Sequence, residues 1–369
     1  MATVRPPPQI GAAVPVELQL ERLAASLPVV SLGPAADSEC EIWAVLGGAQ
    51  PGSSIKDLLA MGLLTLAREA GALAPGQALI ESTSGSMGVG LAWAARCLGH
   101  PLTLVSDPHI PALTRMKIEA HGATLITVDA PHPRGGWQQA RAERVRALLA
   151  ARPELYFVEQ NHSPFNPGAH ARWLVPALAR RVDPATIDAA VFVVGSGGHF
   201  SALSRWLVEA NPSCRCFAAE RPGSRTFGAP RPGTSVLRGV GNSDIVPGVI
   251  ARAFERVSGV VNVPDAHSLA ACRRLLEAHN LLVGPTSGLA YVAATALAQR
   301  LRRGVVLTLF PDRGELYAPL LTEAPKDVPL RRWREGSGPW VSTDAPATRP
   351  QTQARPSPPR RVNPGRTPR

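Results

Sequence analysis

The sequence predicts an α/β fold made of two doubly wound, mostly parallel-sheet domains. Short apolar runs alternate with longer amphipathic segments along most of the chain, which is typical of parallel strands joined by helices. Sheets of this kind are covered by helices on both faces. The chain has 369 residues, of which 45% are hydrophobic and 18% charged, so it is long enough for two packed domains.

The predicted strands are short runs rich in Val, Ile, Leu and Phe. In chain order they are Ile42–Leu46, Leu79–Glu81, Leu102–Val105, Thr124–Val128, Tyr156–Val158, Ala190–Val194, Cys216–Ala219 and Val305–Phe310.

Apolar residues spaced three and four apart predict helices between most of these strands. Gly71, Gly99 and Gly122 stand where a left-handed residue would end a helix. Residues from about Arg221 to Val246 are rich in Gly, Pro, Arg and Ser, which indicates an excursion between domains. The predicted helices include Met87–Leu98, Ile110–His121, Trp137–Ala151, Gly198–Ala210, Leu269–His279 and Leu289–Leu301.

The net charge of +11 comes largely from the end of the chain. Residues 345–369 contain six arginines, seven prolines and no acidic residue, a composition that predicts a disordered tail. We expect this tail to be an inert or solubilising extension, with an anionic partner as the alternative. The charge therefore does not indicate a nucleic-acid-binding protein.

Five cysteines without metal-ligand spacing favour a reducing cytoplasm, and no metal site is expected. Pro6-Pro7-Pro8 interrupts any signal-peptide core, and no run of apolar residues is long enough to span a membrane.

Three loops carry the residues that suggest chemistry. Ligands of open parallel sheets bind beyond the carboxyl ends of the strands, in loops that lead into helices. Ser82–Gly88 and Gly195–His199 follow predicted strands, and Gly284–Gly288 opens a helix. Their Gly, Ser and Thr residues suit an anion held by backbone N–H groups.

A nicotinamide-dependent oxidoreductase is one reading of the Gly195–His199 loop. Glu220 stands 22 residues after Gly198, at the end of a predicted strand, where a dinucleotide fold places its ribose-binding acid. However, Lys56 follows Ser53-Ser54 directly, and hydride transfer does not require this lysine together with a hydroxyl-rich loop.

Six motifs, in order, resemble the cysteine synthase (O-acetylserine sulfhydrylase) family of fold-type II pyridoxal-phosphate enzymes, which includes the tryptophan synthase β subunit. The resemblance runs from about Leu27 to Tyr317. The motifs are the strand Leu27–Leu32, the lysine motif Gln50–Asp57, the loop Glu81–Gly88, Gln160 with Asn166-Pro167, the phosphate loop Gly195–His199 and the segment Pro311–Tyr317.

The resemblance implies that pyridoxal 5′-phosphate lies in a cleft between the two domains. It implies that Lys56 forms the internal Schiff base and is the catalytic residue, and desolvation near a helix start would lower the pKa of this amine. It also implies phosphate contacts from Gly195, Ser196, Gly197, Gly198 and His199, although His199 stands where the family has threonine and could instead face solvent.

By the same resemblance, Thr286 bonds the pyridine nitrogen, which favours α,β-elimination chemistry. Thr83, Ser84, Gly85, Met87 and Gln160 are expected to bind substrate. The alternatives are that Thr286, Thr83 and Ser84 only cap helices and that Gln160 is structural.

Two residues depart from the family pattern. Ser86 replaces the asparagine that contacts the 3′-oxygen of the cofactor, and Met87 replaces a threonine. We therefore expect β-replacement on an O-activated L-serine-type substrate, through an aminoacrylate intermediate, giving L-cysteine or another β-substituted alanine. A β-elimination enzyme and a catalytically weak regulatory homologue remain alternatives.

The resemblance also implies a domain division and a homodimer that acts on a small amino-acid substrate. We expect an N-terminal extension over residues 1–26, a large cofactor-binding domain over 27–50 and 160–325, a smaller substrate-loop domain over 51–159, and a disordered tail over 326–369.

Overall fold

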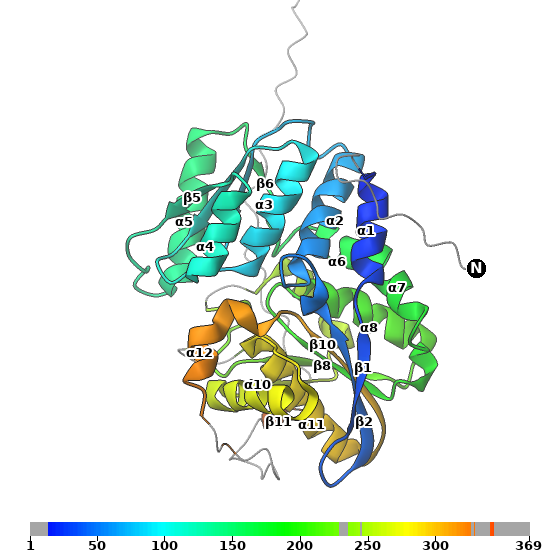
Figure 1. Cartoon of the computed structure of the whole chain (residues 1–369). Coiled ribbons are helices and arrows are strands. Elements are labelled where there is room, and N and C mark those ends of the chain that lie inside the picture. Colours follow the sequence, from blue (N-terminus) through cyan, green and yellow to red (C-terminus); the bar gives the residue numbers. More distant parts are fainter. Residues whose placement is uncertain (1–13, 229–234, 244–245, 326–327, 329–339, 343–369) are drawn as a thin grey trace, which may run out of the picture.

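Two sheets organise the chain (Figure 1). The computed structural model describes residues 14–228, 235–243, 246–325, 328 and 340–342. Within these residues, one sheet has the strand order β1-β2-β10-β7-β8-β9-β11 and the other the order β5-β4-β3-β6. The second sheet is parallel throughout, whereas in the first β1 pairs antiparallel with β2, and β11 with β9.

The strands of the larger sheet are β1 (Val29–Pro34), β2 (Glu39–Leu46), β7 (Ala189–Val193), β8 (Arg215–Glu220), β9 (Gly259–Asn262), β10 (Arg303–Phe310) and β11 (Trp340–Ser342). Those of the smaller sheet are β3 (Leu79–Ser82), β4 (Leu102–Ser106), β5 (Thr124–Thr127) and β6 (Tyr156–Phe157).

Helices connect the strands and cover both sheets (Figure 1). They are α1 (Val16–Ala25), α2 (Lys56–Glu69), α3 (Ser86–Leu98), α4 (Ala112–Ala120), α5 (Gly136–Ala151), α6 (Phe165–Ala169), α7 (Val175–Ala179), α8 (Gly198–Ala210), α9 (Gly248–Ala251), α10 (Asp265–His279), α11 (Pro285–Leu301) and α12 (Ala318–Thr322). A π-helical turn, His170–Leu174, joins α6 to α7.

Strand β7 shows why its sequence is apolar without alternation. All five of its residues are buried. Ala190 and Phe192 point into one apolar cluster, and Ala189, Val191 and Val193 into another, because successive side chains of a strand face opposite sides of the sheet. Both faces of the larger sheet are therefore packed, as predicted.

The fold class is confirmed, and the eight predicted strands are all present. Gly71, Gly99 and Gly122 have φ values of 68°, 76° and 82°, as expected for left-handed caps. The prediction missed β9 and α1, although the buried residues Leu20, Leu23 and Ala24 of α1 have helical spacing. The predicted domain boundaries remain a proposal, although the smaller sheet takes its strands from residues 79–157.

Strand β11 was not expected, because residues 326–369 were predicted to be disordered. Residues 340–342 pair with the outer edge of β9, where exposed N–H and C=O groups can accept another strand. The arginine-rich residues 345–369 lie outside the described part of the chain. In the part that the structure describes, no helix combines the length and the apolar character needed to cross a bilayer.

Candidate active site

Lys56 is the first residue of α2 and lies where the two sheets meet. A hydrogen bond stabilises the preceding turn, because the Asp57 carboxylate accepts from the Gly52 N–H. Within this turn Ser53 adopts a left-handed backbone conformation, with a φ of 71°. The backbone of Ile55 donates to the Pro311 carbonyl oxygen at 2.8 Å. This pairing brings Lys56 beside Asp312, at the carboxyl end of β10.

Burial lowers the pKa of Lys56 to about 8, and the negative charge of Asp312 offsets part of this effect. A larger fraction of the amine is therefore neutral near neutral pH than for an exposed lysine. A neutral amine is the form that attacks a carbonyl carbon.

The loop after β7, Ser196–His199, opens helix α8 without any side-chain cap among the described residues. The first backbone N–H groups of a helix need partners, and they suit an anion. A Cβ atom at Gly195 or Gly198 would fall far inside van der Waals contact with the Gly239 carbonyl oxygen or the Asn166 side chain. Only glycine fits at these two positions, so the backbone can approach a ligand closely.

His199 is 8% exposed, which excludes the alternative that it faces solvent. Its ring packs edge-to-face against Phe192 and against His170, with ring centroids 6.0 and 6.1 Å apart. Burial and the nearby charge of Lys56 lower the pKa of His199 to about 3, so the imidazole is neutral at neutral pH. Its Nε2 atom is buried and has no partner among the described residues.

Thr286 lies at the start of α11 and contacts Asp312, the carboxylate beside Lys56. Its hydroxyl donates to the Asp312 carboxylate at 2.9 Å, and Ser287 donates to the same oxygen at 3.2 Å. Tyr317 forms side-chain hydrogen bonds with both Asp312 and Ser86. The structure thus joins Ser86, from the smaller sheet's loop, to the Thr286 region through two residues to which the sequence analysis gave no role.

The Ser82–Gly88 loop connects β3 to α3. The Thr83 hydroxyl accepts hydrogen bonds from the N–H groups of Gly85, at 3.2 Å, and Gly88, at 3.0 Å. This hydroxyl therefore caps α3, which is the structural alternative for Thr83. A Cβ atom at Gly85 would meet nothing within 4 Å, so the loop is open at this position.

Gln160 lies against this loop, as the resemblance implied. Its backbone N–H donates to the Glu81 carboxylate at 3.0 Å, and its side-chain amide donates to the Ser82 carbonyl oxygen at 3.4 Å. Glu81 is 3% exposed, and burial raises its pKa to about 7. The arrangement places the amide of Gln160 within reach of whatever the loop binds.

Met87 is placed differently from our expectation. Its side chain is 4% exposed and belongs to the apolar cluster that packs α2 and α3. Methionine at this position fills the core under the loop, which removes its side chain from the open side where substrate was expected.

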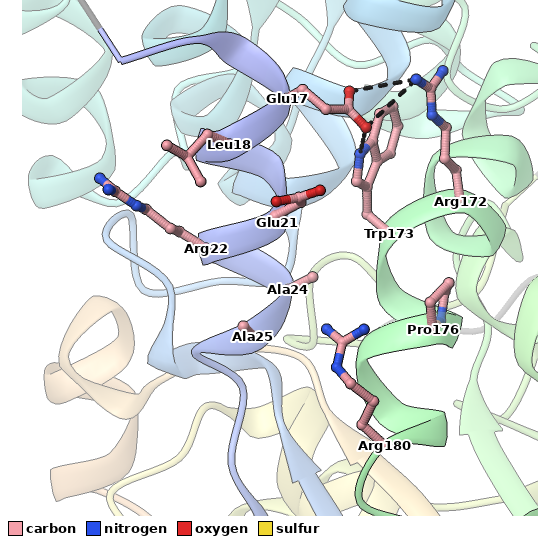
Figure 2. Close-up of a pocket in the computed structure, with 10 residues that line it drawn as sticks. All are labelled: Glu17, Leu18, Glu21, Arg22, Ala24, Ala25, Arg172, Trp173, Pro176 and Arg180. Atoms are coloured by element: carbon pink, nitrogen blue, oxygen red, sulfur yellow. Dashed lines mark hydrogen bonds and ion pairs between the residues drawn. The ribbon is translucent and has the colours of Figure 1, made fainter.

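A groove with polar lining lies elsewhere, between α1 and the segment from Arg172 to Arg180 (Figure 2). Its volume is about 450 Å³. Glu17 there accepts a hydrogen bond from the Trp173 indole at 2.9 Å and pairs with Arg172. None of the residues predicted to carry the chemistry lines this groove.

The residues around Lys56 fit pyridoxal phosphate. The uncapped start of α8 can receive the phosphate, Thr286 offers a hydroxyl to a ring nitrogen, and Lys56 offers an amine. The buried, unpartnered Asn166 Oδ1 and His199 Nε2 atoms beside the same loop show a polar region that the protein does not complete by itself. Among the described residues, no group of three His, Cys, Asp or Glu side chains could hold a metal ion.

Two mostly parallel sheets with an anion cradle, a partly buried lysine and a hydroxyl-rich loop between them define a cofactor-dependent α/β enzyme. The family described as "Pyridoxal-phosphate dependent enzyme" matches residues 22–312. The chain belongs to this family, which confirms the predicted cofactor, pyridoxal 5′-phosphate, and the enzyme class.

Similar proteins agree with this assignment. The chain is 34% identical, over 293 residues, to an N-(2-amino-2-carboxyethyl)-L-glutamate synthase from Ralstonia nicotianae, covering 79% of this chain and 85% of the relative. An O-acetylserine-dependent cystathionine β-synthase from Helicobacter pylori has a TM-score of 0.73 and 27% identity, over 81% of this chain and 96% of that one. A hydrogen sulfide-producing enzyme from Fusobacterium nucleatum, at 23% identity and a TM-score of 0.74 over 81% of this chain and 98% of that one, shares the fold.

Proposed function

We propose that the protein catalyses β-replacement on an O-activated L-serine-type substrate. The observation that carries this proposal is the position of Lys56, a partly buried amine between the phosphate-loop helix and the Thr286–Asp312 pair. Two similar proteins fit this reaction by their names: an N-(2-amino-2-carboxyethyl)-L-glutamate synthase and an O-acetylserine-dependent cystathionine β-synthase. The product is cysteine or another β-substituted alanine, and an amino-acid nucleophile is supported by the name of the Ralstonia relative.

Pyridoxal phosphate, when bound, withdraws electrons from the α-carbon of an amino acid. The backbone N–H groups at the start of α8 would hold its phosphate, with His199 beside them. Thr286 would meet its ring nitrogen, backed by the buried carboxylate of Asp312, and Ser86 would meet its 3′-oxygen. These residues would orient the ring next to the open loop at Gly85.

Lys56 would bind the cofactor and then handle the proton of the reaction. When free of the cofactor, the neutral Nζ atom of Lys56 would take the α-proton of the substrate, and after the β-substituent has been exchanged it would return a proton to Cα. The Thr83–Gly85 backbone, the Ser84 hydroxyl and the Gln160 amide would hold the α-carboxylate during these steps.

A Lys56→Ala variant tests this proposal. Purified wild-type protein should carry visible absorbance from the bound cofactor and should consume O-acetyl- or O-phospho-L-serine in the presence of a nucleophile. Lys56→Ala should lose the covalently attached cofactor, and its turnover should fall by about a hundredfold or more. Lys117→Ala is the matched control, because Lys117 also lies by the Gly52-Ser53 turn, donating to both residues at 3.4 Å.

The control should keep both properties. Wild-type protein that binds the cofactor but releases pyruvate without using any nucleophile would instead support β-elimination. Wild-type protein unable to bind added cofactor would support a regulatory homologue.

We also propose that the protein is a cytoplasmic homodimer. The five cysteines are all free in the structure, four of them buried, which is compatible with a reducing compartment. Sedimentation analysis of the holoenzyme tests the dimer, and a monomer at all concentrations would contradict it.

A further inference from the structure

Two arginines from different parts of the chain converge beside the open substrate loop. Arg141 lies on α5, against the smaller sheet, and Arg238 lies on the segment that follows β8 of the larger sheet. Both pair with the same carboxylate, Asp107, which follows β4. Arg141 also donates to the Ser82 hydroxyl at 3.4 Å, and Arg238 to the Ser84 carbonyl oxygen at 3.4 Å.

The cluster carries more positive than negative charge. Two guanidinium groups share one carboxylate, and the neighbouring Glu81 carboxyl has a pKa raised to about 7 by burial, so it supplies only part of a negative charge at neutral pH. Asp107 is 1% exposed and the Arg141 side chain 9% exposed. Because charge attraction is stronger where water is excluded, an additional anion would be favoured here.

Arg238 is also linked to the proposed cofactor region through its charge. Its positive charge acts on Tyr317, the residue that bonds both Ser86 and Asp312. Among the described residues, both of its hydrogen bonds use Nη1, although a guanidinium has five N–H donors in a fixed fork. The remaining donors suit a carboxylate or phosphate, which binds a guanidinium through two oxygens.

The residues that follow Arg238 are hydrogen-bonded to elements of both sheets, and these bonds fix the position of Arg238. The N–H of Gly241 donates to the Val194 carbonyl oxygen at 2.8 Å, and Asn242 donates to the Gly195 carbonyl oxygen at 3.1 Å, which attaches the segment to the phosphate loop. Gln138 of α5 bonds Asn242 at 2.9 Å and the Ser243 N–H at 2.9 Å. Arg238 is therefore held over the substrate loop from both sheets.

We propose that Arg238, supported by Arg141 and Asp107, is a specificity-determining residue that binds a second anionic group of a substrate, in addition to the α-carboxylate. This inference rests on the proposed β-replacement. The anion is either a phosphate on the leaving group or a side-chain or α-carboxylate of an amino-acid nucleophile. Both present the same pair of oxygens to a guanidinium, and the two half-reactions distinguish them.

The experiment compares wild-type holoenzyme with Arg238→Gln, Arg238→Lys and the control Arg225→Gln, an exposed arginine of the same segment. In the first half-reaction, the absorbance change of the bound cofactor is titrated with L-serine, O-acetyl-L-serine and O-phospho-L-serine. In the second, protein pretreated with the best of these is mixed with sulfide, L-glutamine or L-glutamate.

If the site binds phosphate, Arg238→Gln should weaken the binding of O-phospho-L-serine by about ten- to a hundredfold. The affinities for L-serine and O-acetyl-L-serine should stay within about threefold of wild type. A nucleophile site predicts a loss of the same size for L-glutamate but not for sulfide. In either case Arg238→Lys should recover part of the loss, and Arg225→Gln should match wild type.

Equal loss with every substrate would make Arg238 a structural or α-carboxylate residue and would overturn the proposal, as would no loss with any of them. Wild-type holoenzyme that shows no cofactor response to any serine derivative would overturn the proposed function itself, and the anion site with it.

Discussion

The loop at Gly195–His199 and the loop at Ser82–Gly88 have the same topology but opposite packing. Each follows a buried parallel strand and opens a helix. In the first loop, Cβ atoms at Gly195 and Gly198 would collide with backbone or with Asn166, whereas a Cβ atom at Gly85 in the second would meet nothing within 4 Å. The loop proposed to hold the cofactor is thus fixed by close packing, and the loop proposed to hold the substrate has room.

This difference accounts for how one fold can keep its cofactor while its relatives act on different substrates. The phosphate loop is surrounded by the backbone of Gly239 and by Asn166, so few changes are tolerated there. In our proposal, Ser86 and Arg238, with Arg141 behind it, select at the open loop which groups a substrate carries.

The strongest test of this comparison is the pair Gly198→Ala and Gly85→Ala. Gly198→Ala should lower the free energy of unfolding by about 1–3 kcal/mol, because the Asn166 side chain must move to make room for the methyl group. The same change should weaken the binding of pyridoxal phosphate by more than about tenfold. Gly85→Ala should change the free energy of unfolding by less than about 0.5 kcal/mol and should leave cofactor binding unchanged. Urea unfolding and cofactor titration measure both, and equal effects would contradict the comparison.

The two loops should also respond oppositely to pH. At the phosphate loop, the folded-state pKa of His199 is lowered from 6.5 to about 3, so the unfolded chain binds more protons between these values. Because His199 stays neutral in the folded state, the free energy of unfolding decreases as pH falls below 6.5. Between about pH 7 and pH 5 the loss is about 2 kcal/mol.

His199→Asn should remove about this much of the acid-induced destabilisation in urea unfolding. The buried His170 ring has a pKa lowered in the same direction by burial, so the acid sensitivity of the variant should fall without disappearing. A variant as acid-sensitive as wild type would show that His199 does not titrate in this way.

A smaller effect is expected at the substrate loop. The folded-state pKa of Glu81 is raised from 4.5 to about 7, so the folded protein binds more protons between these values, and stability falls as pH rises through 7. Between about pH 6 and pH 8 this loss is about 1 kcal/mol. Glu81→Gln should remove this part of the loss, and Glu220, whose pKa burial also raises to about 7, should keep a loss of the same sign. An unchanged slope of unfolding free energy against pH in this range would argue against the account.

The sequence predicted the sheet strands well for physical reasons. Strands such as β7 are apolar throughout because they are buried on both faces, and this leaves a strong signal. Lys56 is also conspicuous, since it stands between a glycine-serine turn and an apolar helix. Left-handed caps at Gly99 and Gly122 were predictable because glycine adopts that conformation at little cost.

What could not be predicted depends on contacts between distant residues. Asp107, Arg141 and Arg238 are separated by up to 131 residues, and nothing local marks them as partners. The partnership of Thr286 with Asp312, and the burial of His199 and Met87, likewise follow from tertiary packing. The Pro311–Tyr317 motif was the one sequence signal that could have pointed to Asp312 and Tyr317.

The central claim is that the amine of Lys56 carries the cofactor. Holoenzyme reduced with borohydride and digested should yield a pyridoxyl-phosphate adduct on the peptide that contains Lys56, detected by mass spectrometry. The peptide containing Lys117 should stay unmodified. An unmodified Lys56 peptide from fully cofactor-loaded protein, or an adduct on another lysine, would contradict the account.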